Sequence, residues 1–163
     1  MANQQHLDLL KQGKDTWNQW RQEHQDVHPN LSKANLSGTN LMNFDLSEAD
    51  LSGADLDEAN LRGAYLKGAD LSGADLKKAK LEGANFRSAI LTRADLRSAY
   101  LNDAYLKGAD LTRVNLSEAR LIGTYLGGAK LIGADLRRAY LNEANLKGGF
   151  RKFQVILGLQ FLG

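Results

Sequence analysis

The sequence predicts an all-β protein, a β-solenoid that follows a short α-helical cap. A large apolar residue recurs at every fifth position from 31 to 146, and alanine stands two positions before most of them. The first 29 residues lack this repeat, and the last 14 break it. With 163 residues the chain has the size of one domain. We divide it into an N-terminal helical cap over residues 1–29, a repeat region over 30–149 and an apolar C-terminal segment over 150–163.

The cap region contains two predicted helices. Leu7 and Leu10, spaced i and i+3, indicate a short helix that ends near Gly13. We predict that Asp15 is the N-cap of a second helix, because aspartate accepts hydrogen bonds from unpaired N–H groups at helix starts. That helix should end before His28, since a residue that precedes proline disfavours the α region.

A solenoid needs caps because its terminal coils are otherwise bare. We expect Leu10, Trp17 and Trp20 to cover the open core of the first coil. Phe44, a bulky residue in a column of small ones, fits extra room beneath this cap. The alternative for the two tryptophans is a binding surface.

The repeat itself excludes ordinary helices and strands. Leucine fills 23 of the 24 slots from 31 to 146, alanine fills 19 of the 23 slots two positions earlier, and glycine often follows leucine by two. Five helical steps advance about 140° past a full turn, and a straight strand would alternate successive leucines between its faces. The leucines can all lie on one side of the backbone if the chain turns a corner at the glycine position in every repeat. Leucine and alanine then face inward, and the expected core includes Leu36, Leu56, Leu76, Phe86, Leu96, Leu116 and Leu136.

The C-terminal segment has a different composition, with eight large apolar residues after Gly149. Its pattern fits a short helix or a strand, and two roles stay open: a C-terminal cap, or a contact that forms a homodimer. A membrane anchor is disfavoured because the segment falls short of the roughly 20 apolar residues that span a bilayer. The candidate oligomer contacts are Phe150, Phe153, Ile156, Leu157, Leu159 and Phe161.

Composition and motifs remove most classes of chemistry. The chain has no cysteine, which excludes disulfides, thiolate metal sites and a cysteine nucleophile. All three histidines lie in the cap, no two of them form a His-x-x-x-His pair within a helical metal-ligand set, and no phosphate-binding glycine motif is present. We therefore expect no catalytic residues, metal site, cofactor or small-molecule substrate. The polar start lacks the basic and apolar regions of a signal peptide, which favours a cytoplasmic location.

The run from Leu31 to Gly148, with its Ala-(Asp/Asn)-Leu consensus, closely resembles the pentapeptide-repeat proteins, a family abundant in cyanobacteria. The resemblance implies a right-handed quadrilateral β-helix with four pentapeptides per coil, so that 24 repeats form about six coils. Periodicity alone does not fix the number four.

If coils hold 20 residues, residues 20 apart stack into outward columns. One such face interleaves tyrosines with basic residues, a combination that stacks on bases or holds phosphates. The alternative is plain ladder packing between neighbouring coils. The candidate binding residues on this face are Tyr65, Lys67, Arg87, Tyr105, Lys107 and Tyr125.

Three functions from different classes follow. We favour a non-enzymatic, rigid protein–protein interaction scaffold whose partner is unknown. The resemblance also implies a DNA-mimic modulator of DNA gyrase or topoisomerase, but residues 30–149 carry 16 basic and 15 acidic residues, and a mimic needs a strongly acidic surface. The third is a binder of polyanions or nucleic acid through the face of tyrosines and basic residues, which the net charge of +2 also disfavours.

Overall fold

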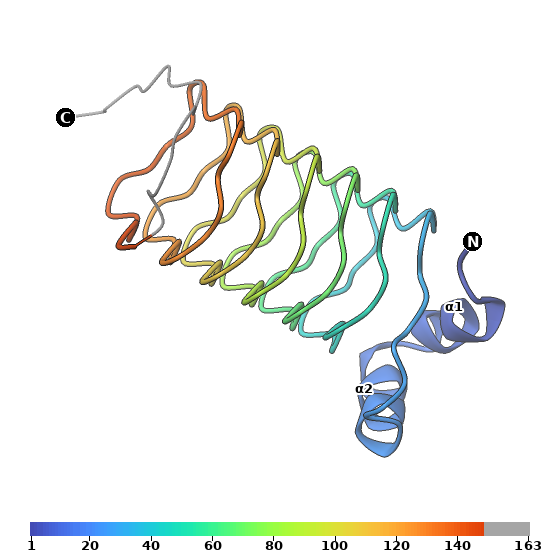
Figure 1. Ribbon diagram of the computed structural model, residues 1–163. Helices are drawn as coiled ribbons and strands as arrows, with labels where there is room; N and C mark the ends of the chain where they lie inside the picture. Colours follow the sequence, from blue (N-terminus) through green and yellow to red (C-terminus); the bar gives the residue numbers. More distant parts are fainter. Residues whose placement is uncertain (149–163) are drawn as a thin grey trace.

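The structure, a computed structural model, describes residues 1–148. Helices α1 (Gln4–Lys11) and α2 (Lys14–Glu23) precede a stack of coils that forms one straight rod (Figure 1). The segment predicted as a C-terminal cap or oligomer contact, with its six candidate residues, lies outside the described residues. Among the described residues no helix has the length and apolar character needed to cross a membrane.

Successive coils pair in parallel through bridges between residues 20 positions apart, such as Asn35 with Asp55 and Asp55 with Asp75. Four bridge columns begin at Asn30, Asn35, Asn40 and Asp45 and end at positions 130, 135, 140 and 145. Each coil therefore contains four pentapeptides, and each column has six levels. The bridges are isolated rather than gathered into strands, because a turn interrupts the backbone in every repeat.

The consensus has a direct explanation in the hydrogen bonds of the repeat from 94 to 98. The N–H groups of Asp95, Leu96 and Ser98 donate to carbonyls of neighbouring coils, and that of Ala94 closes a turn onto the preceding leucine. The remaining N–H, of Arg97, donates to the Asp95 carboxylate at 3.2 Å. Asp or Asn before leucine thus satisfies the one amide that neither the turn nor the adjacent coils can reach.

Corners lie at the second residue after leucine. This residue has a positive φ in every repeat in which it is described, for example 65° at Gly73 and 56° at Ser98. Glycine recurs there because it adopts this conformation without a steric penalty.

The leucine and alanine columns fill the centre of the rod. The predicted core residues are buried, none more than 5% exposed: Leu36, Leu56, Leu76, Phe86, Leu96, Leu116 and Leu136. Thr124 stands in the alanine column and is also buried, and its hydroxyl donates to the Leu101 carbonyl at 2.9 Å. The buried hydroxyl of Thr124 therefore has a hydrogen-bond partner inside the core.

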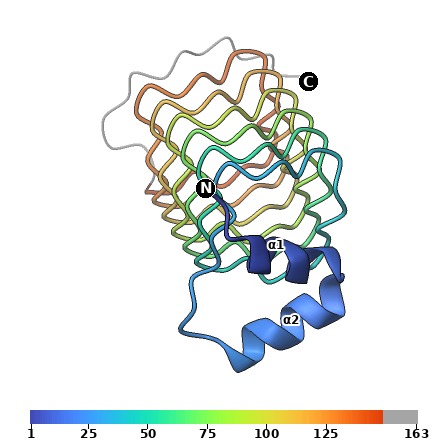
Figure 2. The same ribbon diagram turned by 90° about the vertical axis from the view of Figure 1, so that its right-hand side faces the viewer.

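The two helices lie against the first coil (Figure 2). Leu10, Trp17 and Phe44 belong to the same buried cluster as the leucine columns. The Trp17 indole donates to the Asp45 carbonyl at 2.7 Å, which ties α2 to the coil. Trp20 is half-buried and packs on Trp17 with ring centroids 5.4 Å apart. These residues close the N-terminal end of the core.

Two features of the cap differ from expectation. The predicted N-cap at Asp15 is wrong: α2 starts earlier, with Gly13 at the N-cap, and Asp15 lies in the first turn. Gly13 has φ of 100°, a conformation that favours glycine and lets the chain reverse directly after α1. Arg21, unremarked in the sequence, is only 5% exposed and donates to the carbonyls of Val27 and Ser47 at 2.6 and 3.0 Å.

Candidate functional site

One side of the rod carries all the predicted binding residues, and we call it the tyrosine face. Its tyrosine slots are joined by bridges from Tyr65 through Asn85 and Tyr105 to Tyr125. The basic residues stand two positions after these slots, and the inward residue between them is leucine or, before Arg87, Phe86. The members of the tyrosine face are Tyr65, Lys67, Arg87, Tyr105, Lys107 and Tyr125.

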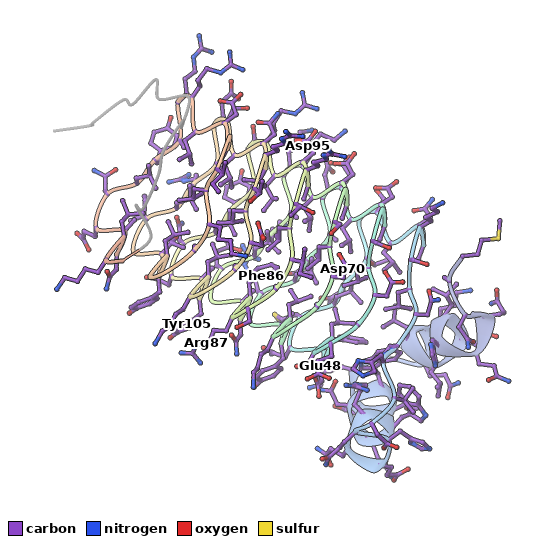
Figure 3. The ribbon with its side chains drawn as sticks, viewed as in Figure 1. Glu48, Asp70, Phe86, Arg87, Asp95 and Tyr105 are labelled. Carbon is purple, nitrogen blue, oxygen red and sulfur yellow. The ribbon has the colours of Figure 1, made fainter. Side chains whose placement is uncertain are left out.

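Three of these side chains form a continuous stack across three coils. The rings of Tyr105 and Tyr125 are parallel within 3°, with centroids 4.9 Å apart. The Arg87 guanidinium, from the preceding coil, lies over the Tyr105 ring at 4.9 Å from its centroid. Figure 3 shows Arg87 and Tyr105 next to each other at the outer edge of the coils. Tyr65 stands two coils away from Tyr105 and takes no part in this stack.

The positive charges of the tyrosine face form no ion pair within the part of the chain that the structure describes. Lys67, Arg87 and Lys107 are exposed, and within residues 1–148 none of them forms an ion pair with a carboxylate. The acidic residues of this column, Asp45 and Glu48, stand at its first level beside the cap. From the second coil onward the face is therefore basic and aromatic.

On the opposite side of the rod, arginines form ion pairs with neighbouring aspartates. Arg97 pairs with Asp95 at 2.7 Å and Arg137 pairs with Asp135 at 2.6 Å. Hydrogen bonds from the Arg137 guanidinium hold the pKa of Asp135 below its ordinary value. Partial burial alone would raise the pKa of Asp95, but the bonds from Arg97 lower it overall. Figure 3 shows Asp95 across the rod from Tyr105. The column of carboxylates is thus not a free acidic surface.

The histidines are spread over the cap rather than gathered. His6 accepts a hydrogen bond at Nδ1 from the Asn30 amide at 2.9 Å, and His24 stacks on Trp20. His28 lies 3.5 Å from the Glu48 carboxylate. In the part of the chain that the structure describes, no three His, Cys, Asp or Glu side chains lie close enough to hold a metal ion.

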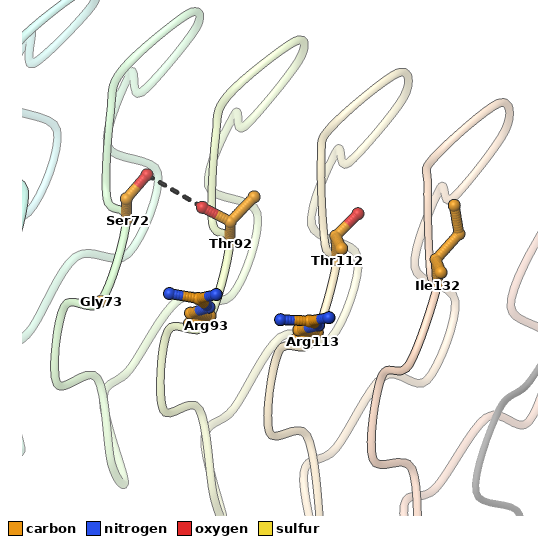
Figure 4. Close-up of a pocket in the computed structure, with 7 residues that line it drawn as sticks. All are labelled: Ser72, Gly73, Thr92, Arg93, Thr112, Arg113 and Ile132. Atoms are coloured by element: carbon orange, nitrogen blue, oxygen red, sulfur yellow. Dashed lines mark hydrogen bonds between the residues drawn. The ribbon is translucent and has the colours of Figure 1, made fainter.

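Two further surface residues, Arg93 and Arg113, were not predicted as candidates from the sequence. They stand 20 positions apart at equivalent corners and line a groove on another side of the rod (Figure 4). Their spacing was visible in the sequence, but the sequence does not show that they form no ion pair within residues 1–148.

Comparisons with known proteins agree on the repeat. The family model for pentapeptide repeats matches eight copies in overlapping segments that together span residues 30–149. A search of curated proteins found no match.

Several solved structures resemble the chain. HetL, a pentapeptide repeat protein involved in heterocyst differentiation regulation in the cyanobacterium Nostoc, is 36% identical over 76% of this chain and 72% of its own, with a TM-score of 0.40. A pentapeptide repeat protein from the Arabidopsis thaliana thylakoid lumen is 32% identical over 66% and 68%, with a TM-score of 0.47. QnrB1, a plasmid-mediated fluoroquinolone resistance protein, is 21% identical over 71% and 74%, with a TM-score of 0.39.

Proposed function

This chain belongs to the pentapeptide-repeat family, and from that premise we propose that it is a non-enzymatic scaffold that binds a protein partner through the tyrosine face. The partner is expected to present an acidic surface. The single observation behind this proposal is the set of basic side chains on the tyrosine face that have no carboxylate partner among residues 1–148, next to the stack of Arg87, Tyr105 and Tyr125.

The chemistry of the tyrosine face suits a protein interface. Tyrosine and arginine are the residues that most often contribute strongly to protein–protein binding. The stack already fixes the side chains of Arg87, Tyr105 and Tyr125, so that little rotamer freedom is lost on binding. The exposed Lys67 and Lys107 would complement carboxylates on a partner and favour the correct encounter.

The alternatives have weaker support. A nucleic-acid binder commonly neutralises about 6–10 phosphates, whereas the tyrosine face offers three basic members and the whole chain has a net charge of +2. A DNA mimic needs an open acidic surface, but Arg97 and Arg137 cover the carboxylates of Asp95 and Asp135. We therefore favour a protein partner and leave nucleic acid as an outcome of the test.

The test is affinity capture with the immobilised full chain from the source cell, with and without nuclease. The double variant Lys67→Glu, Lys107→Glu reverses charge on the tyrosine face. The control Lys80→Glu, Arg120→Glu changes the net charge by the same amount at exposed positions of the neighbouring column.

A protein retained by the wild type and the control, lost by the tyrosine-face variant and unaffected by nuclease, is the expected result. Equal retention by both variants would refute the role of the tyrosine face. Retention that nuclease abolishes, and that weakens steeply with salt, would replace the protein partner by nucleic acid.

A further inference from the structure

A groove of about 580 Å³ runs along a side of the rod that the tyrosine face does not occupy. Two rows of side chains line it, as Figure 4 shows. One row consists of the hydroxyl groups of Ser72, Thr92 and Thr112, and the other of the guanidinium groups of Arg93 and Arg113. Each row repeats once per coil, so its members are about 4.8 Å apart. The groove therefore presents hydrogen-bond donors from two directions.

The two arginines are held side by side by the backbone. Both occupy the corner position, with φ of 60° at Arg93 and 58° at Arg113. Glycines precede and follow them in the same column, and these residues without side chains leave the groove open. The Arg113 Cγ lies 3.3 Å from the point where a Cβ on Gly133 would stand, while the space beside Gly73 is empty. A larger residue at Gly73, which lines the groove, would fill part of it.

Two acidic residues near the groove pair with other cations. Asp95 pairs with Arg97 at 2.7 Å, and Asp110 pairs with Lys130 at 3.2 Å. On the side that holds the hydroxyl row, Ile90 takes the slot that aspartate fills at positions 50, 70 and 110.

Within the described part of the chain, two neighbouring guanidinium groups are therefore left without a carboxylate partner. Among the described residues, neither Arg93 nor Arg113 forms an ion pair. Asp70, the aspartate one coil before Ile90, accepts the amide of Ser72 at 2.8 Å and does not line the groove.

Ile90 also changes the hydrogen bonds within the row of hydroxyl groups. In a regular repeat the hydroxyl donates to the aspartate two positions before it, as Ser52 does to Asp50 at 2.6 Å. Thr92 has no such aspartate and donates instead to the Ser72 hydroxyl at 3.1 Å. Ser72 accepts this bond, and its own hydrogen is available to a ligand in the groove.

We propose that this groove binds a phosphate monoester, with its terminal oxygens between Arg93 and Arg113 and the hydroxyl of Ser72. Paired guanidinium groups match the several acceptor oxygens of a phosphate and bind them through charge-assisted hydrogen bonds. Ile132, which is 52% exposed at one end of the groove, offers an apolar contact to the organic part of the ester. This site is independent of the tyrosine face and of its partner.

The test is calorimetric titration of the full chain with inorganic phosphate and, separately, with phenyl phosphate. Both should bind, and phenyl phosphate more tightly because its ring can contact Ile132. Arg93→Gln and Arg113→Gln should each weaken binding by about tenfold or more, because each removes charged hydrogen bonds. The matched control is Arg138→Gln, which changes an arginine at the same repeat position that already pairs with Glu118 at 3.6 Å.

Circular dichroism should show that all three variants keep the wild-type spectrum, since these side chains are exposed. The side-chain Nε–H resonances of Arg93 and Arg113 in the wild type should shift on addition of phosphate. The proposal is overturned if the wild type binds neither probe at tens of millimolar, or if both groove variants bind as the wild type does.

Discussion

Replacement of Leu96 by lysine should prevent the middle of the rod from folding. Leu96 lies in the fourth of six levels of its column and is fully buried. Its amide donates to the Asn115 carbonyl at 2.7 Å, and its carbonyl accepts from Ala99 at 3.1 Å. These backbone bonds are open to any residue, so the effect of the substitution comes from the side chain alone.

The magnitude follows from burial. Loss of the buried leucine side chain costs about 1.5–3 kcal/mol of transfer free energy. An ammonium group without a partner adds a penalty of several kcal/mol, so Leu96→Lys should cost about 5 kcal/mol or more. This is comparable with the roughly 5–15 kcal/mol that stabilises a whole domain. Leu96→Ala, which leaves a cavity but no charge, should cost about 2–5 kcal/mol.

Circular dichroism and urea denaturation would measure both variants against a matched control. Ile90→Lys also exchanges a branched apolar residue for lysine, but Ile90 is 41% exposed and shares its column with Lys130. The control should stay within about 0.5 kcal/mol of the wild type. Soluble Leu96→Lys protein with the spectrum and urea midpoint of the wild type would refute the assignment of Leu96 to the core.

Three further substitutions test other parts of the structure. Ser88→Gly should raise the thermal midpoint, because φ of 58° costs a non-glycine residue about 1–2 kcal/mol and the extra chain entropy of glycine costs less; a lower midpoint would contradict this. Trp17→Phe removes the indole donor to the Asp45 carbonyl and should lower the free energy of unfolding in urea by about 1–3 kcal/mol. A variant as stable as the wild type would show that this hydrogen bond is dispensable. Because the pKa of Asp135 is lower in the folded state, its stabilising effect is complete above the unfolded value of about 3.9 and is lost as the pH falls through the folded value. Arg137→Gln should therefore flatten the fall in Tm below about pH 4, and an identical pH profile would count against the pairing.

The repeat and its core could be predicted from the sequence because inward positions must be apolar whatever the size of the coil. The number of repeats per coil could not, because a period of five contains no signal for where a coil closes. That number came from the family resemblance, and the bridges between residues 20 apart supply it directly. The aspartate before leucine was visible as a pattern, but its role as the acceptor for an otherwise unpaired amide needs the coordinates.

The cap and the groove show where sequence reasoning fails. Arg21 resembles any surface arginine of a polar helix, and only the carbonyls of Val27 and Ser47, which come from segments outside that helix, explain its burial. Arg93 and Arg113 are equally ordinary in sequence. Their distinction is that the nearby carboxylates pair with other cations, a property of three-dimensional neighbours that no spacing rule detects.

The core repeats every five residues, but each coil closes only after 20. The side of the rod on which a surface residue lies therefore depends on the number of repeats before it. Insertion or deletion of one pentapeptide would keep every inward leucine and alanine in place, yet would turn all later side chains by one side of the rod. Deletion of one repeat between Arg87 and Tyr100 would move Tyr105 to the side that Tyr100 now occupies and would separate it from Arg87. Deletion of four repeats would only shorten the rod by one coil. Changes of length are thus tolerated by the core in steps of five, but by the recognition surfaces only in steps of 20.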